Sequence, residues 1–160
     1  MVRQANSNDY DFMYGLYFHP HINPFLLYEM EETVNFPTIF KDLLHKNILY
    51  IFEENGEKAG MFKLVPFTYR TAHAAYLGGV AIHPTYMGKG LGVLMLQEII
   101  AFSVKSGFNR IELSTAVTNE KAVHLYEKVG FQKEGVLRRY TYLKSENRYL
   151  DEVLMSYLSD

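Results

Sequence analysis

Two hydrophobic periodicities divide the chain into short elements. Apolar residues recur at helical spacing over residues 8–18, 35–45, about 91–107 and 119–130, and each range predicts a helix. Apolar runs that are continuous or alternate with polar residues predict strands over residues 1–5, 48–52, 59–65, 73–82, 110–116, 132–143 and 148–158. This order of elements predicts an α/β (α+β) fold, a mixed sheet with helices packed on its faces.

Glycine and asparagine residues refine this pattern at two places. Asn55-Gly56 stands between two predicted strands and is a strong signal for a two-residue hairpin turn. Gly78-Gly79 interrupts an otherwise apolar strand, where glycines often mark a bulge or a close approach of backbone to a ligand.

A glycine-rich loop, Met87 to Gly92, opens the third predicted helix and carries glycines at 88, 90 and 92. Such a loop exposes backbone N–H groups at the positive end of a helix dipole, a combination that binds phosphate. It is not a nucleotide P-loop, because Lys89 is followed by Gly90 rather than by Ser or Thr. Its spacing and its place in the middle of the chain also exclude a dinucleotide loop. Two interpretations are left, a pyrophosphate site and a plain glycine-rich turn.

A second pattern lies in residues 119–131. Asn119 and Tyr126 are seven residues apart, so they share one face of a helix, two turns from each other. Together with the glycine loop, this pattern resembles the GNAT superfamily of acetyl-CoA-dependent N-acetyltransferases. The loop motif of that family, Gln/Arg-x-x-Gly-x-Gly/Ala, is matched by residues 87–92, and its Asn-x-x-Ala-x-x-x-Tyr motif by residues 119–126.

The resemblance covers residues 73–158 well, and the tail from 138 to 158 looks like the ribosomal-protein and polyamine acetyltransferase branches. It implies a mostly antiparallel sheet of six or seven strands with about four helices on both faces. It also implies a single acetyltransferase domain over residues 1–160. Residues 1–72 would form the acceptor-side half and residues 73–158 the acetyl-CoA-binding half.

The resemblance implies a role for each residue that matches the family's cofactor site. The backbone of Val80, Ala81 and Ile82 would pair with the pantetheine arm, and the side chain of Asn119 would contact it. The pyrophosphate would be held by the N–H groups of Met87, Gly88, Lys89, Gly90, Leu91 and Gly92. Met87 departs from the Gln or Arg of the family, so we expect somewhat weaker CoA binding.

Tyr126 is the residue that the resemblance places in the chemistry, as the general acid that protonates the leaving thiolate. A thiol has a pKa near 8.5 and tyrosine near 10, so the transfer is uphill by only about 2 kcal/mol. Without the family match, packing in the core would be the plainer interpretation of this residue, because it shares a helical stripe with Ala122 and Val129.

The sequence does not supply an obvious general base. Members of the family often carry a Glu at the positions that correspond to Tyr76 and Ser114, and neither residue is a carboxylate. Ordered water or a group from elsewhere would then remove the proton from the acceptor amine. Glu29, Glu31 and Glu32 lie in the acceptor-side half, where they either recognise the amine or form an ordinary solvated face.

Composition narrows the class of protein further. The chain has 160 residues, 48% hydrophobic residues, a net charge of -2 and no cysteine. We expect no nucleic-acid partner, no membrane span or signal peptide, and a cytoplasmic location. The pair His19 and His21 has no ligand spacing beside it, and no metal is expected. A homodimer through the final aromatic-rich hairpin is possible by analogy with the family.

These observations favour an N-acetyltransferase that moves an acetyl group from acetyl-CoA to a primary amine, directly in a ternary complex. The acceptor is a small molecule or a peptide. The lack of cysteine supports direct transfer, because the most obvious acyl-enzyme nucleophile is missing. Two alternatives stay open: a non-catalytic acyl-CoA-binding sensor or partner module, which the missing carboxylates favour, and a transferase of longer acyl groups.

Overall fold

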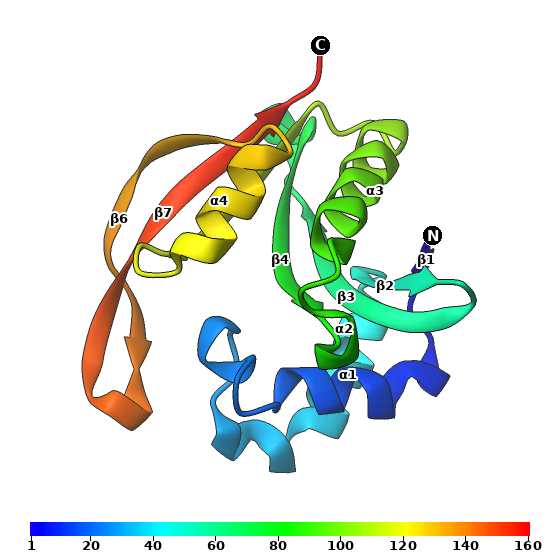
Figure 1. The fold of residues 1–160 in the computed structure, drawn as a ribbon, viewed down its shortest axis with the longest axis vertical. Coiled ribbons are helices and arrows are strands. Elements are labelled where there is room, and N and C mark those ends of the chain that lie inside the picture. The colour runs from blue at the N-terminus through cyan, green and yellow to red at the C-terminus, as the bar shows by residue number, and fades with distance from the viewer.

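The protein is described by a computed structural model that covers residues 1–160. Seven strands form one open sheet in the order β1-β2-β3-β4-β5-β7-β6 (Figure 1). All neighbouring pairs are antiparallel except β4 and β5, which confirms the predicted mostly antiparallel mixed sheet. The strands are β1 (Val2–Gln4), β2 (Leu49–Glu54), β3 (Glu57–Pro66), β4 (Ala74–Ile82), β5 (Arg110–Ala116), β6 (Gln132–Leu143) and β7 (Arg148–Leu158).

Four α-helices cover the two faces of this sheet, as predicted. They are α1 (Tyr10–Tyr17), α2 (Phe36–His45), α3 (Leu91–Lys105) and α4 (Glu120–Lys128). The first helix starts later than the sequence predicted, because Asn6 caps a short 3-10 turn with a reciprocal bond to Asp9 before α1 begins. No helix is long and apolar enough to cross a membrane.

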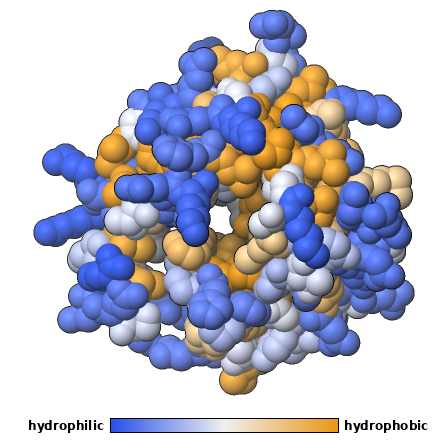
Figure 2. All heavy atoms as spheres, viewed as in Figure 1, coloured by the Kyte–Doolittle hydropathy of each residue, from blue (hydrophilic) through white to orange (hydrophobic).

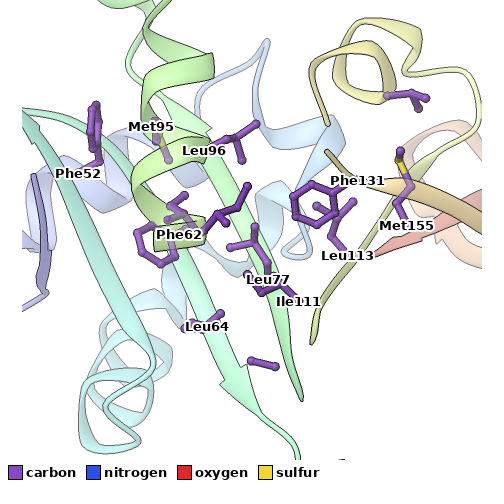
Figure 3. Packing of buried hydrophobic residues seen from close by; sticks show 14 of the residues in the cluster. Phe52, Phe62, Leu64, Leu77, Met95, Leu96, Ile111, Leu113, Phe131 and Met155 are labelled. Carbon is purple, nitrogen blue, oxygen red and sulfur yellow. The ribbon is translucent and has the colours of Figure 1, made fainter. Parts of the chain in front are cut away.

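Each face of the sheet has its own hydrophobic core. On one face α3 and α4 pack over the centre of the sheet, where Figure 3 shows Leu96 of α3 among residues from β3, β4 and β5. On the other face α1 and α2 pack over β2 and β3 through a cluster of aromatic rings centred on Phe36. The apolar runs of the central strands follow from this burial on both sides.

The parallel pair in the middle of the sheet is short. β4 and β5 pair only at Ala74 with Arg110, Ala75 with Ile111 and Tyr76 with Glu112. Beyond Tyr76 the two strands separate, so the edge of β4 that faces β5 has no strand partner from Leu77 to Ile82. The resulting gap leads through the sheet from one layer of helices to the other.

An ion cluster fixes the first strand and helix to the sheet. Asp9 is fully buried and accepts hydrogen bonds from both terminal nitrogens of Arg3 at 2.8 and 2.9 Å, while the Lys58 ammonium lies 2.8 Å away. Burial alone would raise the pKa of Asp9, but the bonds from Arg3, Lys58 and the Asn6 amide outweigh it and hold the pKa well below its usual range. The charged form of Asp9 therefore stabilises the fold at neutral pH.

We predict that Asp9→Asn lowers the free energy of unfolding by about 3 kcal/mol at pH 7, because it leaves Arg3 and Lys58 facing a neutral group. Because the pKa of Asp9 is lower in the folded than in the unfolded protein, its carboxylate stabilises the fold at pH values above the unfolded-state pKa, and this stabilisation is lost as the pH falls. The difference between wild type and variant should therefore shrink below about pH 4. Urea unfolding across this range measures it. The exposed Asp11→Asn is the control and should cost under about 1 kcal/mol. Equal effects of the two substitutions would contradict the prediction.

Candidate active site

The gap between β4 and β5 opens into the main cleft of the protein, which has a volume of about 1160 Å³. Its walls come from the glycine loop, from β4, β5, α4 and β7, and from residues 21–27 between α1 and α2. Figure 2 shows an opening near the centre of the molecule, between polar and apolar side chains. A volume of this size accommodates an extended ligand and a second small molecule.

The β4 strand supplies one wall with a free backbone edge. Its pairing with β3 shifts between Met61 and Lys63, so Gly79 and Val80 fall in a bulge that the ladder does not engage. Gly79 has a left-handed φ of +58°, and a Cβ there would lie 3.0 Å from the Tyr17 hydroxyl. The bulge predicted from Gly78-Gly79 is thus confirmed, and it turns backbone groups of β4 toward the cleft.

The glycine loop keeps its amides free. Gly90 has a φ of +75° and occupies the N-cap of α3, where its lack of a side chain permits this conformation. None of the N–H groups from Gly88 to Gly92 donates a hydrogen bond to a protein acceptor, whereas the Met87 amide already donates to the Pro84 carbonyl. The loop therefore presents five free amides at the start of α3, one fewer than the six that the sequence predicted, in an arrangement suited to an anion.

Asn119 lies at the N-terminal end of α4 and lines the cleft. Asn119 occupies the N-cap of α4, but its side chain makes no capping bond. The amide nitrogen donates instead to the Thr115 hydroxyl at 3.2 Å. This bond to the end of β5 holds the side chain in the wall of the cleft, within reach of a ligand rather than of the helix end.

Tyr126 projects from α4 into the same cleft. Its ring packs against Phe131 at 5.8 Å between centroids and leaves the residue half-buried. Burial, with a smaller effect of Tyr76, raises the pKa of Tyr126 to about 12. Against an ordinary thiol this would make proton donation uphill by about 5 kcal/mol, more than the sequence suggested. A thiolate formed in the same desolvated cleft has a raised pKa as well, which narrows the difference.

A chain of hydrogen bonds crosses the floor of the cleft on the side of α1 and α2. The Tyr76 hydroxyl lies 3.2 Å from the Ser114 hydroxyl, which donates to a carboxylate oxygen of Glu152 at 2.7 Å. The second carboxylate oxygen accepts from Thr141 at 3.2 Å. Tyr76 and Ser114, the two strand positions that lack a carboxylate, are thereby connected to the carboxylate of Glu152 on β7.

Glu152 is the residue of this site that the sequence analysis missed. It pairs with Ala116 across β5 and β7, which puts its side chain beside that of Ser114. The only signal in the sequence is its place in the alternating pattern of the last strand, opposite in phase to the buried Val153 and Met155. The alternation shows on which face of the sheet Glu152 lies. It does not show which strand pairs with β7, or in which register, and these become known only from the structure.

Two acidic residues of the acceptor-side half contact the tip of the β6–β7 hairpin. Glu29 accepts a hydrogen bond from the Lys144 amide at 3.2 Å, and Glu31 pairs with the Lys144 ammonium at 2.8 Å. These contacts join the segment between α1 and α2 to the tip of the β6–β7 hairpin. Two of the three glutamates suggested for amine recognition are therefore engaged in a contact between segments.

The segment that forms the acceptor-side wall is held together by one side chain. The Asn23 amide nitrogen donates to the backbone carbonyls of Tyr17 at 2.8 Å and Tyr28 at 2.7 Å. Phe25 and Leu27, which lie between these anchors and line the cleft, are 60% and 73% exposed. His19 and His21 have ring centroids 5.7 Å apart, and no three His, Asp or Glu side chains gather in a way that could hold a metal ion.

Comparison with known sequences gives a family and several relatives. A family model described as "Acetyltransferase (GNAT) family" matches residues 10–131. The spermidine N(1)-acetyltransferase of Escherichia coli strain K12 is 31% identical over 129 residues, which cover 76% of this chain and 68% of that protein. The N-alpha-acetyltransferase RimI of Mycobacterium tuberculosis is 34% identical over 70 residues, 44% of this chain and 42% of that protein.

Solved structures give the same grouping. A spermidine N-acetyltransferase from Vibrio cholerae, crystallised with CoA and spermine, superposes with a TM-score of 0.85 at 26% identity, covering 99% of this chain and 94% of that one. A ribosomal-protein-alanine N-acetyltransferase from Brucella melitensis superposes with a TM-score of 0.80 over 99% of both chains. At 18% identity, the second likeness shows the fold alone.

We predict that Gly79→Ala destabilises the protein by about 1–3 kcal/mol. The left-handed φ alone costs a residue with a Cβ about 1–2 kcal/mol, and the new methyl group would press on the buried Tyr17 ring. Gly135→Ala is the matched control, because a Cβ there meets nothing within 4 Å and the backbone is unstrained. Thermal unfolding compares the two, and a variant at Gly79 as stable as the control would contradict the close packing of this bulge.

Proposed function

The chain belongs to the GNAT family of acetyltransferases, as its two motifs predicted, and from this premise we propose that it acetylates the primary amine of a small acceptor with acetyl-CoA. The proposal rests on one observation above all: a single cleft joins a loop of free amides on one side of the sheet to a carboxylate on the other. Both substrates are then present together, and transfer is direct.

The residues of the second half form the acetyl-CoA side of this arrangement. The amides of Gly88 to Gly92 bind the pyrophosphate, with Lys89 adding charge. The pantetheine arm pairs with the free edge of β4 at Val80, Ala81 and Ile82, and the carbonyl oxygen of the Asn119 side chain accepts from it. Met87 contributes an exposed apolar side chain, so the loop lacks one polar contact to the phosphates.

Glu152 is the group best placed to accept the proton of the acceptor amine. An alkylamine is mostly protonated at pH 7 and must lose a proton before it attacks. The carboxylate lies in the acceptor-side wall, and the bonds from Ser114 and Thr141 fix its orientation. It therefore takes the place of the carboxylate that β4 and β5 lack at Tyr76 and Ser114.

The transfer then proceeds in balanced steps. The neutral amine attacks the thioester carbonyl, whose oxygen is polarised by the backbone N–H groups that the bulge at Gly79 and Val80 turns toward the cleft. The carbon–sulfur bond breaks, and Tyr126 gives its proton to the departing thiolate. The attacking nitrogen then loses its extra proton to the Tyr126 phenolate, which leaves a neutral amide, free CoA thiol and a protonated Tyr126. Glu152 keeps the proton of the amine until solvent removes it. Holding amine and thioester together supplies much of the acceleration.

The proposed reaction also assigns the two substrates to different parts of the chain. Residues 1–72 shape most of the acceptor side, to which β7 adds Glu152, and the other site residues of 73–158 bind acetyl-CoA. Because relatives named spermidine N(1)-acetyltransferase and RimI differ in their acceptors, polyamines and peptide N-termini both belong in the acceptor assay.

We predict that Tyr126→Phe lowers kcat by about 100-fold or more, the usual contribution of a general acid, while calorimetric CoA binding changes less than threefold. With a pKa near 12, Tyr126 stays protonated through the neutral range, so its loss of a proton should not limit wild-type kcat below about pH 11. Release of free thiol measures the rate. Full activity of the variant would remove Tyr126 as the acid, and CoA binding without thiol release from any acceptor would favour a sensor.

We predict that Glu152→Gln lowers kcat/KM for the acceptor by about 100-fold at pH 7, with CoA affinity unchanged. The defect should shrink as the pH approaches the pKa of the free amine, because the acceptor then arrives already neutral. Glu146→Gln, at the exposed hairpin tip, is the control and should leave the rate unchanged. A Glu152 defect that stays constant from pH 7 to about pH 10 would contradict a role in proton removal.

A further inference from the structure

Lys63 is a buried lysine that the reaction scheme does not use. It lies on β3 on the same face as Met61, is 9% exposed, and lines the cleft. It makes no side-chain hydrogen bond, and every ion pair of the protein involves other basic groups. A buried ammonium without an anion is costly, and proteins rarely keep one without a function.

The surroundings of Lys63 offer it only weak compensation. Its ammonium lies 5.3 Å from the centroid of the Tyr28 ring, a cation–π contact. Its stem runs beside the β4 bulge, since a Cβ on Gly79 would lie 3.5 Å from Lys63 Cε and 3.0 Å from the Tyr17 hydroxyl. That hydroxyl is fully buried and has no hydrogen-bond partner. A cation and a phenol donor thus lie close together with no acceptor between them.

The carboxylate on this side of the molecule is already engaged. Asp42 is exposed and pairs with the Lys46 ammonium at 2.7 Å, so it does not neutralise Lys63. Burial, together with repulsion from Lys46, lowers the pKa of Lys63. A bound anion would reverse this, because an opposite charge in a desolvated site favours the ammonium form.

The two walls of the acceptor side therefore carry opposite charges. Glu152 stands on β7, beyond the gap, and Lys63 stands on β3, on the other side of β4. We propose that the acceptor is an amino acid or related amino carboxylate, whose amine faces Glu152 and whose carboxylate binds the Lys63 ammonium, with Tyr17 as a second donor. This deepens the proposed function and rests on it.

The same charge disfavours acceptors that are purely cationic. A polyamine would bring a second ammonium toward Lys63 in a site with little water, where like charges repel strongly. The name of the spermidine-acetylating relatives therefore does not extend to this chain. Lys63 is a specificity-determining residue in this scheme, and Tyr28, held by Asn23, positions its ammonium.

The test is a thiol-release assay with acceptors matched in pairs. Glycine and β-alanine are each compared with their amides, in which the anion is removed, and spermidine is the acceptor without an anion. Wild type should turn over the acids with a kcat/KM about 10- to 100-fold above the amides, the range of a hydrogen bond to a charged group. Spermidine should be the poorer substrate.

Lys63→Met keeps the length of the apolar stem and removes the charge. It should lower kcat/KM for the acids by about 10- to 100-fold, mainly through KM, and change it for the amides by less than threefold. Because each acceptor is compared between wild type and variant, differences in amine basicity between the acids and the amides cancel in the ratio of the two kcat/KM values. Lys41→Met removes an exposed charge of α2 and should change neither value. Thermal unfolding checks the fold, and Lys63→Gln is the second variant.

Two outcomes would overturn the inference while leaving the proposed function standing: wild-type preference for spermidine over both acids, or equal losses on acids and amides in the Lys63 variants. If neither variant folds, the wild-type order of acids, amides and spermidine decides. Absence of thiol release with every acceptor would instead overturn the proposed function, and the inference with it.

Discussion

The separation of β4 from β5 is the constraint on which the functional architecture depends. The two strands share only three residue pairs, and beyond Tyr76 the free edge of β4 and the walls of β5 and β7 enclose the cleft. A longer parallel ladder would close the sheet and separate its two faces. The bulge at Gly79 interrupts the ladder between β4 and β3, and beyond Tyr76 no strand pairs with the other edge of β4, so backbone groups of β4 are available to a ligand.

The arrangement of acidic groups gives the proposed base a position in the fold that differs from the one common in the family. Ser114 and Tyr76 stand where a carboxylate is common in the family, yet both belong to a hydrogen-bonded chain that ends at Glu152. The antiparallel register of β5 and β7 places Glu152 where its carboxylate accepts a hydrogen bond from the Ser114 hydroxyl. Position in space, rather than position in the motif, defines the candidate base.

The sequence predicted the features that depend on local order along the chain. The glycine loop, the spacing of Asn119 and Tyr126, the Asn55-Gly56 hairpin and the order of elements are all visible in short segments. Glu152 and Lys63 were not predicted, because the contacts of each are made to residues more than ten positions away and depend on strand register. Asn119 occupies the N-cap of α4, but a hydroxyl on β5 orients its side chain, a contact that the local sequence does not show.

The bonds from Asn23 have a consequence for how this family member can diverge. They are made to the backbone carbonyls of Tyr17 and Tyr28, so the path of the segment between them does not depend on the exposed side chains of Phe25 and Leu27. Phe25 and Leu27 can then be exchanged at little cost in folding, although they line the cleft. Selection for a new acceptor could act on this segment while leaving the two cores and the cofactor loop untouched.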